Sequence, residues 1–160
     1  MAIWRPSQTW AITVGLAAAV AIVATGCQPA SGNCVVTMPN GNTPSGEKSG
    51  PSYHGNGQLW TALWPDGRVV FRPGGPGSTE PDGTLGMKWP WWRGVQGRLS
   101  IQGRRLDGAA PPLRAQIPDG YGEAGFQSTG LLFPTEGCWE VTGQVDGASL
   151  TFVTRVVKLT

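Results

Sequence analysis

The stretch CWEVTGQVDGASLTFV, residues 138–153, has two runs of alternating side chains on either side of an Asp-Gly pair. The second run continues to Leu159 and carries Leu150, Phe152 and Val156 on one face. Glycine accepts a positive φ freely and an aspartate side chain can bond the turn backbone, so Asp146-Gly147 suits a tight reversal. The stretch therefore predicts a β-hairpin with one buried face.

The same turn signal recurs along the chain, because all five aspartates are followed by glycine: Asp66-Gly67, Asp82-Gly83, Asp107-Gly108, Asp119-Gly120 and Asp146-Gly147. Turn chemistry explains each of these aspartates. We expect residues 58–64 and 68–72 to form a hairpin around the first turn, and further strands at 98–102 and 113–117. No window after residue 26 has sustained helical spacing. About seven or eight short strands predict an all-β fold, an antiparallel β-sandwich.

Three segments resemble a known group of proteins. They are 133–143 with 150–153 (FPTEGCWEVTG and LTFV), 63–67 (LWPDG) and 91–95 (WWRGV). The first looks like the closing hairpin of the Ig-like sandwich domains of uncharacterised bacterial exported lipoproteins, and the other two fit the same group. The resemblance covers residues 57–160 and implies an Ig-like sandwich, but no activity and no catalytic residue. Trp139 stands where tyrosine is common in sandwich domains, so the hydrogen bond of a tyrosine corner is not carried over.

The first 26 residues predict export. A basic Arg5 precedes an uncharged run over residues 11–24, which is shorter than the roughly 20 apolar residues that cross a bilayer. The run ends in VATGC, residues 23–27, which resembles a bacterial lipobox. It implies a signal peptide over 1–26 and a lipid on Cys27, with the body outside the cytoplasm on the cell membrane, or on the outer membrane of a two-membrane cell. The alternatives are a secretory signal cut near residues 19–21, which leaves a soluble protein, and an uncleaved membrane anchor.

Residues 27–56 are rich in Gly, Pro, Ser and Asn and predict a flexible tether over most of their length, followed by a folded domain over 57–160. The alternative for residues 34–36 is a short strand pinned by a disulfide. With Cys27 acylated, Cys34 and Cys138 form an even pair that we expect to be bridged, since disulfides persist in exported proteins. The alternative is two independent thiols. After the signal peptide is removed, 11 basic and 10 acidic residues remain, and this near-neutral balance argues against a nucleic-acid partner.

The sequence offers little for catalysis, metal binding or a cofactor. His54 is the only histidine, lies in the predicted tether and has no Gly-x-Ser-x-Gly elbow to pair with. Paired carboxylates would have to come from four scattered glutamates, Glu80, Glu123, Glu136 and Glu140. One histidine and two bridged cysteines do not make a metal site. The glycine-rich residues 73–79 lack the Gly-Lys-Ser/Thr ending of a phosphate loop.

The aromatic cluster over residues 89–93, WPWWR, carries the one ligand hypothesis. In an extended segment Trp89 and Trp91 lie on one side and Trp92 on the other. In one interpretation Trp89 and Trp91, with Arg93, form a ligand platform while Trp92 anchors the core. In the other, most of these indoles are buried and Pro90 marks an edge strand.

We therefore expect a non-catalytic, lipid-anchored envelope protein whose β-sandwich presents a binding or scaffolding surface. Its partners would be the membrane, through the lipid, and an envelope protein or glycan. One alternative is a carbohydrate-binding module acting through Trp89 and Trp91, and another is a small envelope hydrolase that uses glutamates.

Overall fold

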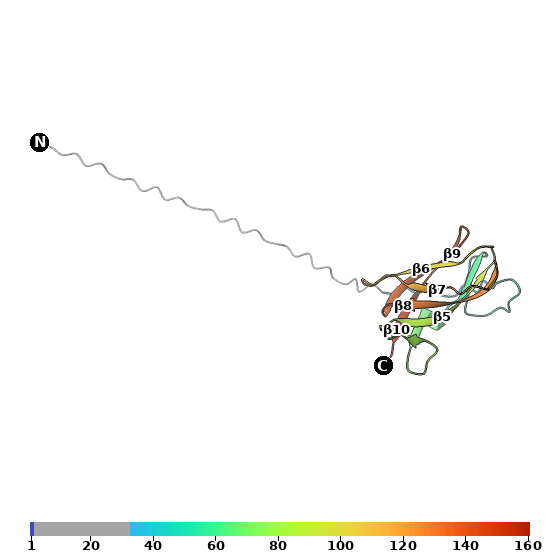
Figure 1. Cartoon of the computed structure of the whole chain (residues 1–160), viewed down its shortest axis with the longest axis horizontal. Helices are drawn as coiled ribbons and strands as arrows, with labels where there is room; N and C mark the ends of the chain where they lie inside the picture. The colour runs from blue at the N-terminus through green and yellow to red at the C-terminus, as the bar shows by residue number, and fades with distance from the viewer. Residues whose placement is uncertain (2–32) are drawn as a thin grey trace.

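The computed structural model describes residues 33–160, together with Met1, and shows two β-sheets packed face to face (Figure 1). The all-β prediction is confirmed: this part of the chain forms ten strands and no α-helix. Among the same residues, no helix has the length and apolar character needed to cross a membrane.

The first sheet is antiparallel and has β5 and β8 at its centre. Its strands follow the order β1-β2-β5-β8-β7, with β4 also paired to β5. The bounds are β1 Tyr53–Gly55, β2 Leu59–Ala62, β4 Ser78–Thr79, β5 Leu85–Arg93, β7 Arg114–Gln116 and β8 Gly125–Phe133. The predicted edge position of Pro90 is wrong, because β5 has neighbours on both sides. β8 pairs with its whole length on one side, and on the other side β2 pairs with one end of β5 and β4 with the opposite end. Pro90, which has no N–H to donate, lies between those two ends.

The second sheet follows the order β3-β10-β9-β6. The bounds are β3 Arg68–Phe71, β6 Ser100–Arg105, β9 Gly137–Val145 and β10 Ala148–Lys158. The predicted hairpin is confirmed as β9 and β10, which pair antiparallel around Asp146 and Gly147. Both turn residues have positive φ, 39° and 82°, the geometry that Asp-Gly favours. β3 pairs with β10 in parallel.

The predicted hairpin of residues 58–64 and 68–72 is wrong. β2 and β3 belong to different sheets, and the chain crosses between them through a 3-10 turn at Pro65–Gly67. Asp66 and Gly67 do have positive φ, 54° and 63°, so the local turn is as expected. Leu59 and Val69 are both fully buried, and the two strands bury these residues across the sandwich from opposite sheets.

Aromatic side chains fill the space between the sheets. Trp89 stacks on Phe152 with ring centroids 5.1 Å apart, and Phe133 meets Trp139 edge to face at 5.7 Å. All four side chains are buried, which contributes roughly 1.5–3 kcal/mol for each large apolar group. The core therefore depends on the four longest strands, β5, β8, β9 and β10.

Two local features hold indoles in place. A Cβ at Gly143 would lie 2.5 Å from Cη2 of Trp91, so only glycine lets β9 approach that ring. At the start of β9, the indole Nε1 of Trp139 donates to the carbonyl of Thr135 at 3.0 Å. Trp139 thus bonds back to the backbone as a corner tyrosine would, although the sequence carried over no such bond.

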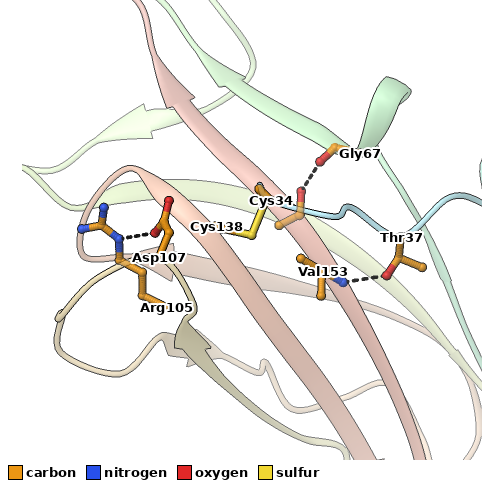
Figure 2. The surroundings of a disulfide bond; sticks show 8 residues. Cys34, Thr37, Gly67, Arg105, Asp107, Cys138 and Val153 are labelled. Carbon is orange, nitrogen blue, oxygen red and sulfur yellow. Dashed lines mark hydrogen bonds and ion pairs between the residues drawn. A yellow bond between two sulfur atoms is a disulfide. The ribbon is translucent and has the colours of Figure 1, made fainter. Parts of the chain in front are cut away.

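Residues 34–56 belong to the folded body. The predicted disulfide is confirmed, with Cys34 bonded to Cys138 across 104 residues (Figure 2). Closing a loop of that length restricts the unfolded chain, which stabilises the folded protein by roughly 4–5 kcal/mol in the chain-entropy model. The N–H of Thr37 donates to the carbonyl of Val153 at 2.9 Å, and its Oγ1 accepts from the Val153 N–H at 2.8 Å. The segment therefore lies beside β10 and pairs with it at Val153.

The predicted tether over 27–56, and a domain that begins at Gly57, are wrong for residues 34–56. The side-chain amide of Asn40 bonds both the N–H and the carbonyl of Gly55, at 3.1 and 2.7 Å. Asn42 accepts a hydrogen bond from the indole of Trp60 at 2.8 Å. Polar side chains and a disulfide hold this segment in place. Its scarcity of apolar residues therefore predicted a flexible tether, although the segment is folded. Residues 27–32 lie outside the described part.

The sandwich has two ends. At the end called here the disulfide end, Phe133 of one sheet contacts Trp139 of the other beside Cys138. β10 ends at Lys158 near this end, and the C-terminus lies there (Figure 1). At the hairpin end, the β9–β10 turn packs near the loop of residues 94–99, where a Cβ at Gly97 would lie 3.1 Å from Val145.

Candidate functional site

Trp89 and Trp91 do not form a surface platform. Both are fully buried between the sheets, where each ring contacts Phe152. Side chains alternate along β5 as predicted, but the face that the platform hypothesis placed at the surface is the buried one. Trp92, expected to anchor the core, points outward. Three large inward side chains are needed to fill the sandwich at β5, and Trp89, Trp91 and Arg93 take those positions.

Trp92 instead belongs to an aromatic surface on the outer face of the first sheet, made by Tyr53, Trp92, Tyr121 and Phe126. The ring centroids of Tyr53 and Trp92 lie 5.1 Å apart, and those of Trp92 and Phe126 lie 5.3 Å apart. Tyr121 meets Phe126 at 6.0 Å. The Phe126 side chain is 46% exposed, so this surface is open to solvent at the hairpin end.

The N-terminal segment forms one border of the aromatic surface. Glu47 accepts a hydrogen bond from the Trp92 indole at 3.1 Å. Burial, and then the negative charge of Glu47, raise the pKa of Tyr53. The segment also covers Trp60, which pairs with Trp92 across β2 and β5. The surface thus combines one exposed ring and three partly exposed rings with one carboxylate.

Arg93 lies at the end of β5 and points inward at the hairpin end. Its guanidinium donates four hydrogen bonds of 2.8–3.2 Å to backbone carbonyls of residues 97, 121, 122 and 123. Arg93 is 4% exposed, and no carboxylate pairs with it among the described residues. It therefore fastens the loop of residues 117–124 to the sandwich.

An open cleft of about 390 Å³ lies beside Arg93 at the same end. It is lined by the loops at 97–99 and 117–123, together with Gln127. The Nε of Arg93 and the Oε1 of Gln127 are buried and have no partner in the described part of the chain. At the rim, Arg98 and Asp119 form an ion pair of 3.6 Å that is almost fully exposed and contributes little.

His54 lies on β1, not in a tether. It pairs with Thr61 of β2, and its Nδ1 is buried with no partner among the described residues. Burial lowers the pKa of His54, although a hydrogen bond with the Met38 backbone opposes this. No serine or cysteine nucleophile hydrogen-bonds to this ring in the described structure.

The four candidate glutamates lie at separate places. Glu80 accepts from Ser78, Glu140 pairs with Arg104 at 2.8 Å, and Glu136 accepts from the backbone N–H of Lys158. Glu123 lies at the cleft beside Arg93. Within residues 33–160, no three His, Cys, Asp or Glu side chains gather as metal ligands would.

Asp107 does more than turn the chain. It pairs with Arg105 at 2.7 Å beside the disulfide (Figure 2). Burial raises its pKa, but hydrogen bonds from Arg105 and from the Cys138 N–H outweigh this effect and leave the pKa below its ordinary value. The pair therefore fixes the loop that follows β6 at the disulfide end.

Cys27 lies outside the described residues, so the structure places no lipidation site. Comparison of the chain with family models, curated proteins and solved structures finds no match in any of the three.

Replacing Arg93 tests its role at the hairpin end. Arg93→Met keeps the length of the side chain but leaves four carbonyls without their donor, so we expect a loss of about 1–3 kcal/mol in the free energy of unfolding. Amide exchange over residues 121–123 should accelerate. Urea denaturation and hydrogen exchange measure the two effects. Arg98→Met is the control, with an expected change within about 0.5 kcal/mol. Equal losses in the two variants would contradict the assignment.

Proposed function

We propose that the chain is a non-catalytic cell-envelope protein, held on the membrane by a lipid on Cys27, whose β-sandwich presents a binding surface. The observation that carries this is the bond between Cys34 and Cys138. It uses two of the three cysteines and leaves Cys27, in its lipobox-like context, as the thiol available for acylation. A disulfide also fits a body that lies outside the cytoplasm.

We also propose that the sandwich is Ig-like. Seven strands, taken in chain order as A to G, are β2, β5, β6, β7, β8, β9 and β10. Their sheets then read A-B-E-D and G-F-C, which is the arrangement of the constant-type Ig fold. The bond from Trp139 at the E–F corner supports the same assignment. The disulfide departs from it, since it joins the N-terminal segment to strand F.

Replacing the acylated thiol tests the anchor. We expect Cys27→Ala to prevent incorporation of radiolabelled palmitate and to move the protein out of the membrane fraction, because no other acyl chain would hold it. Cys34→Ala is the matched control, since it removes a cysteine that is bonded within the body, and it should leave the label in place. Membrane fractionation and label incorporation that are unchanged by Cys27→Ala would contradict the proposal.

The aromatic surface favours a second candidate, in which the presented surface binds a glycan. Sugar rings stack on aromatic faces and bond carboxylates. Phe126 supplies an exposed ring and Trp92 a partly exposed one, and Glu47 supplies a carboxylate beside them. Neighbouring rings meet at angles of 62–76°, so the surface is a set of corners and not a flat platform. A short glycan would stack on one ring at a time.

A glycan panel tests this candidate. Peptidoglycan or polysaccharide fragments should change the tryptophan fluorescence of the protein, and Trp92→Ala and Phe126→Ala should each weaken binding about 5- to 150-fold, since one stacked ring contributes roughly 1–3 kcal/mol. Leu159→Ala, which removes an exposed apolar side chain at the other end, should bind as the native chain does. If no fragment of the panel binds, or if all three variants weaken binding equally, the glycan candidate is wrong.

A further inference from the structure

Two arginines lie side by side next to the disulfide. Across the second sheet, Arg155 of β10 is directly opposite Cys138 of β9 on one side and opposite Arg68 of β3 on the other. Both arginines are exposed on the outer face. Like charges placed opposite each other on neighbouring strands destabilise a sheet. Such a pair is therefore a feature that folding alone does not favour.

No carboxylate of the described residues neutralises this pair. The nearby acids are used elsewhere: Asp107 pairs with Arg105, and Glu140 pairs with Arg104. Glu136 accepts from the backbone N–H of Lys158. Arg68 and Arg155 form no ion pair within the described part of the chain. The disulfide end thus presents two adjacent guanidinium groups that no carboxylate of the described residues contacts, although the whole chain is close to neutral.

Exposed apolar side chains surround the same place. Val35, next to the bridged Cys34, is 81% exposed. Leu106 is 38% exposed and its N–H bonds the carbonyl of Cys138. Leu159, beside the end of β3, is 50% exposed. Basic side chains interspersed with exposed apolar ones are typical of surfaces that lie at a membrane interface.

The chain length keeps this end close to the proposed anchor. Only six residues separate Cys27 from Cys34. An extended segment reaches at most 3.3–3.6 Å per residue, so the disulfide lies within about 25 Å of a lipid-bearing Cys27. This step rests on the proposed function. The predicted tether of some 30 residues would have let the disulfide end lie far from the anchor, whereas the short connection keeps it near.

We propose that the disulfide end docks on the surface of an anionic bilayer. Arg155 and Arg68 bind lipid phosphates, and Val35 and Leu106 enter the headgroup region. The hairpin end, with its aromatic surface and cleft, then faces away from the membrane. A strand of nine residues spans about 30 Å, so the presented surface lies roughly that much further out.

Vesicle co-sedimentation of residues 28–160 without a lipid tests the docking surface. This piece holds every described strand pairing and hydrogen bond. We expect it to bind vesicles of phosphatidylglycerol and phosphatidylcholine, and to bind vesicles of phosphatidylcholine alone much more weakly. Arg68→Ser with Arg155→Ser should lower the partition coefficient roughly 10- to 30-fold, because each cation near such a surface contributes about fivefold. Val35→Ser should lower it further.

Lys88→Ser with Arg98→Ser is the matched control, since it removes the same charge from exposed positions away from the arginine pair: Lys88 lies on the first sheet and Arg98 at the hairpin end. Equal losses in the two double variants would show attraction by net charge only and would overturn the proposal, as would a failure to bind the anionic vesicles. Competition by inorganic phosphate beyond that of chloride at equal ionic strength would assign the arginines to a free anion and overturn it too. Since this piece has no acyl chain, a failure of acylation at Cys27 would leave the assay unchanged.

Discussion

The attachment of residues 34–56 to the sandwich is the constraint on which the rest of the structure depends. The disulfide fixes the start of the segment to β9, and the hydrogen bonds of Thr37 continue it along β10. From there Asn40 and Asn42 carry it across to the first sheet. The segment consequently shapes both ends of the molecule: it exposes Val35 beside the disulfide, and it borders the aromatic surface with Glu47.

The packing between the sheets decides which aromatic residues face solvent. β5 must place large side chains inward at every second position, and Trp89 and Trp91 fill the layer against Phe152. Trp92 is thereby forced outward, where it meets Phe126 and Tyr53. The glycine at 143 allows the opposite sheet to approach Trp91 closely. The aromatic surface is thus a consequence of how the core is filled.

Local patterns predicted the local features of the fold. The alternation around Asp146-Gly147 predicted the β9–β10 hairpin, and the cysteine count predicted the disulfide. Sheet membership was not predictable in the same way, because an Asp-Gly turn has the same local geometry whether the chain reverses within a sheet or crosses to the other, as it does at Asp66. The sequence did not predict the strand at residues 125–133, since Gly130 and the adjacent Leu131 and Leu132 break the alternation of polar and apolar side chains.

The candidate site was predictable only in part. The cluster at residues 89–93 was identified and its alternation was correct, but periodicity gives two faces without saying which is buried. The aromatic partners of Trp92 come from β1 and β8, far away in sequence, and no local pattern joins them. The arginine pair at 68 and 155 depends on a parallel pairing over 87 residues, which only the fold reveals.

Amide hydrogen exchange across residues 34–56, with the disulfide intact, tests this account most directly. The account predicts slow exchange at the N–H groups of Thr37, Gly41 and Gly55, which donate to Val153, Tyr53 and Asn40. Exchange at the rate of an unstructured peptide throughout this segment would contradict it. Residues 34–56 would then be a flexible connection and not part of the folded body.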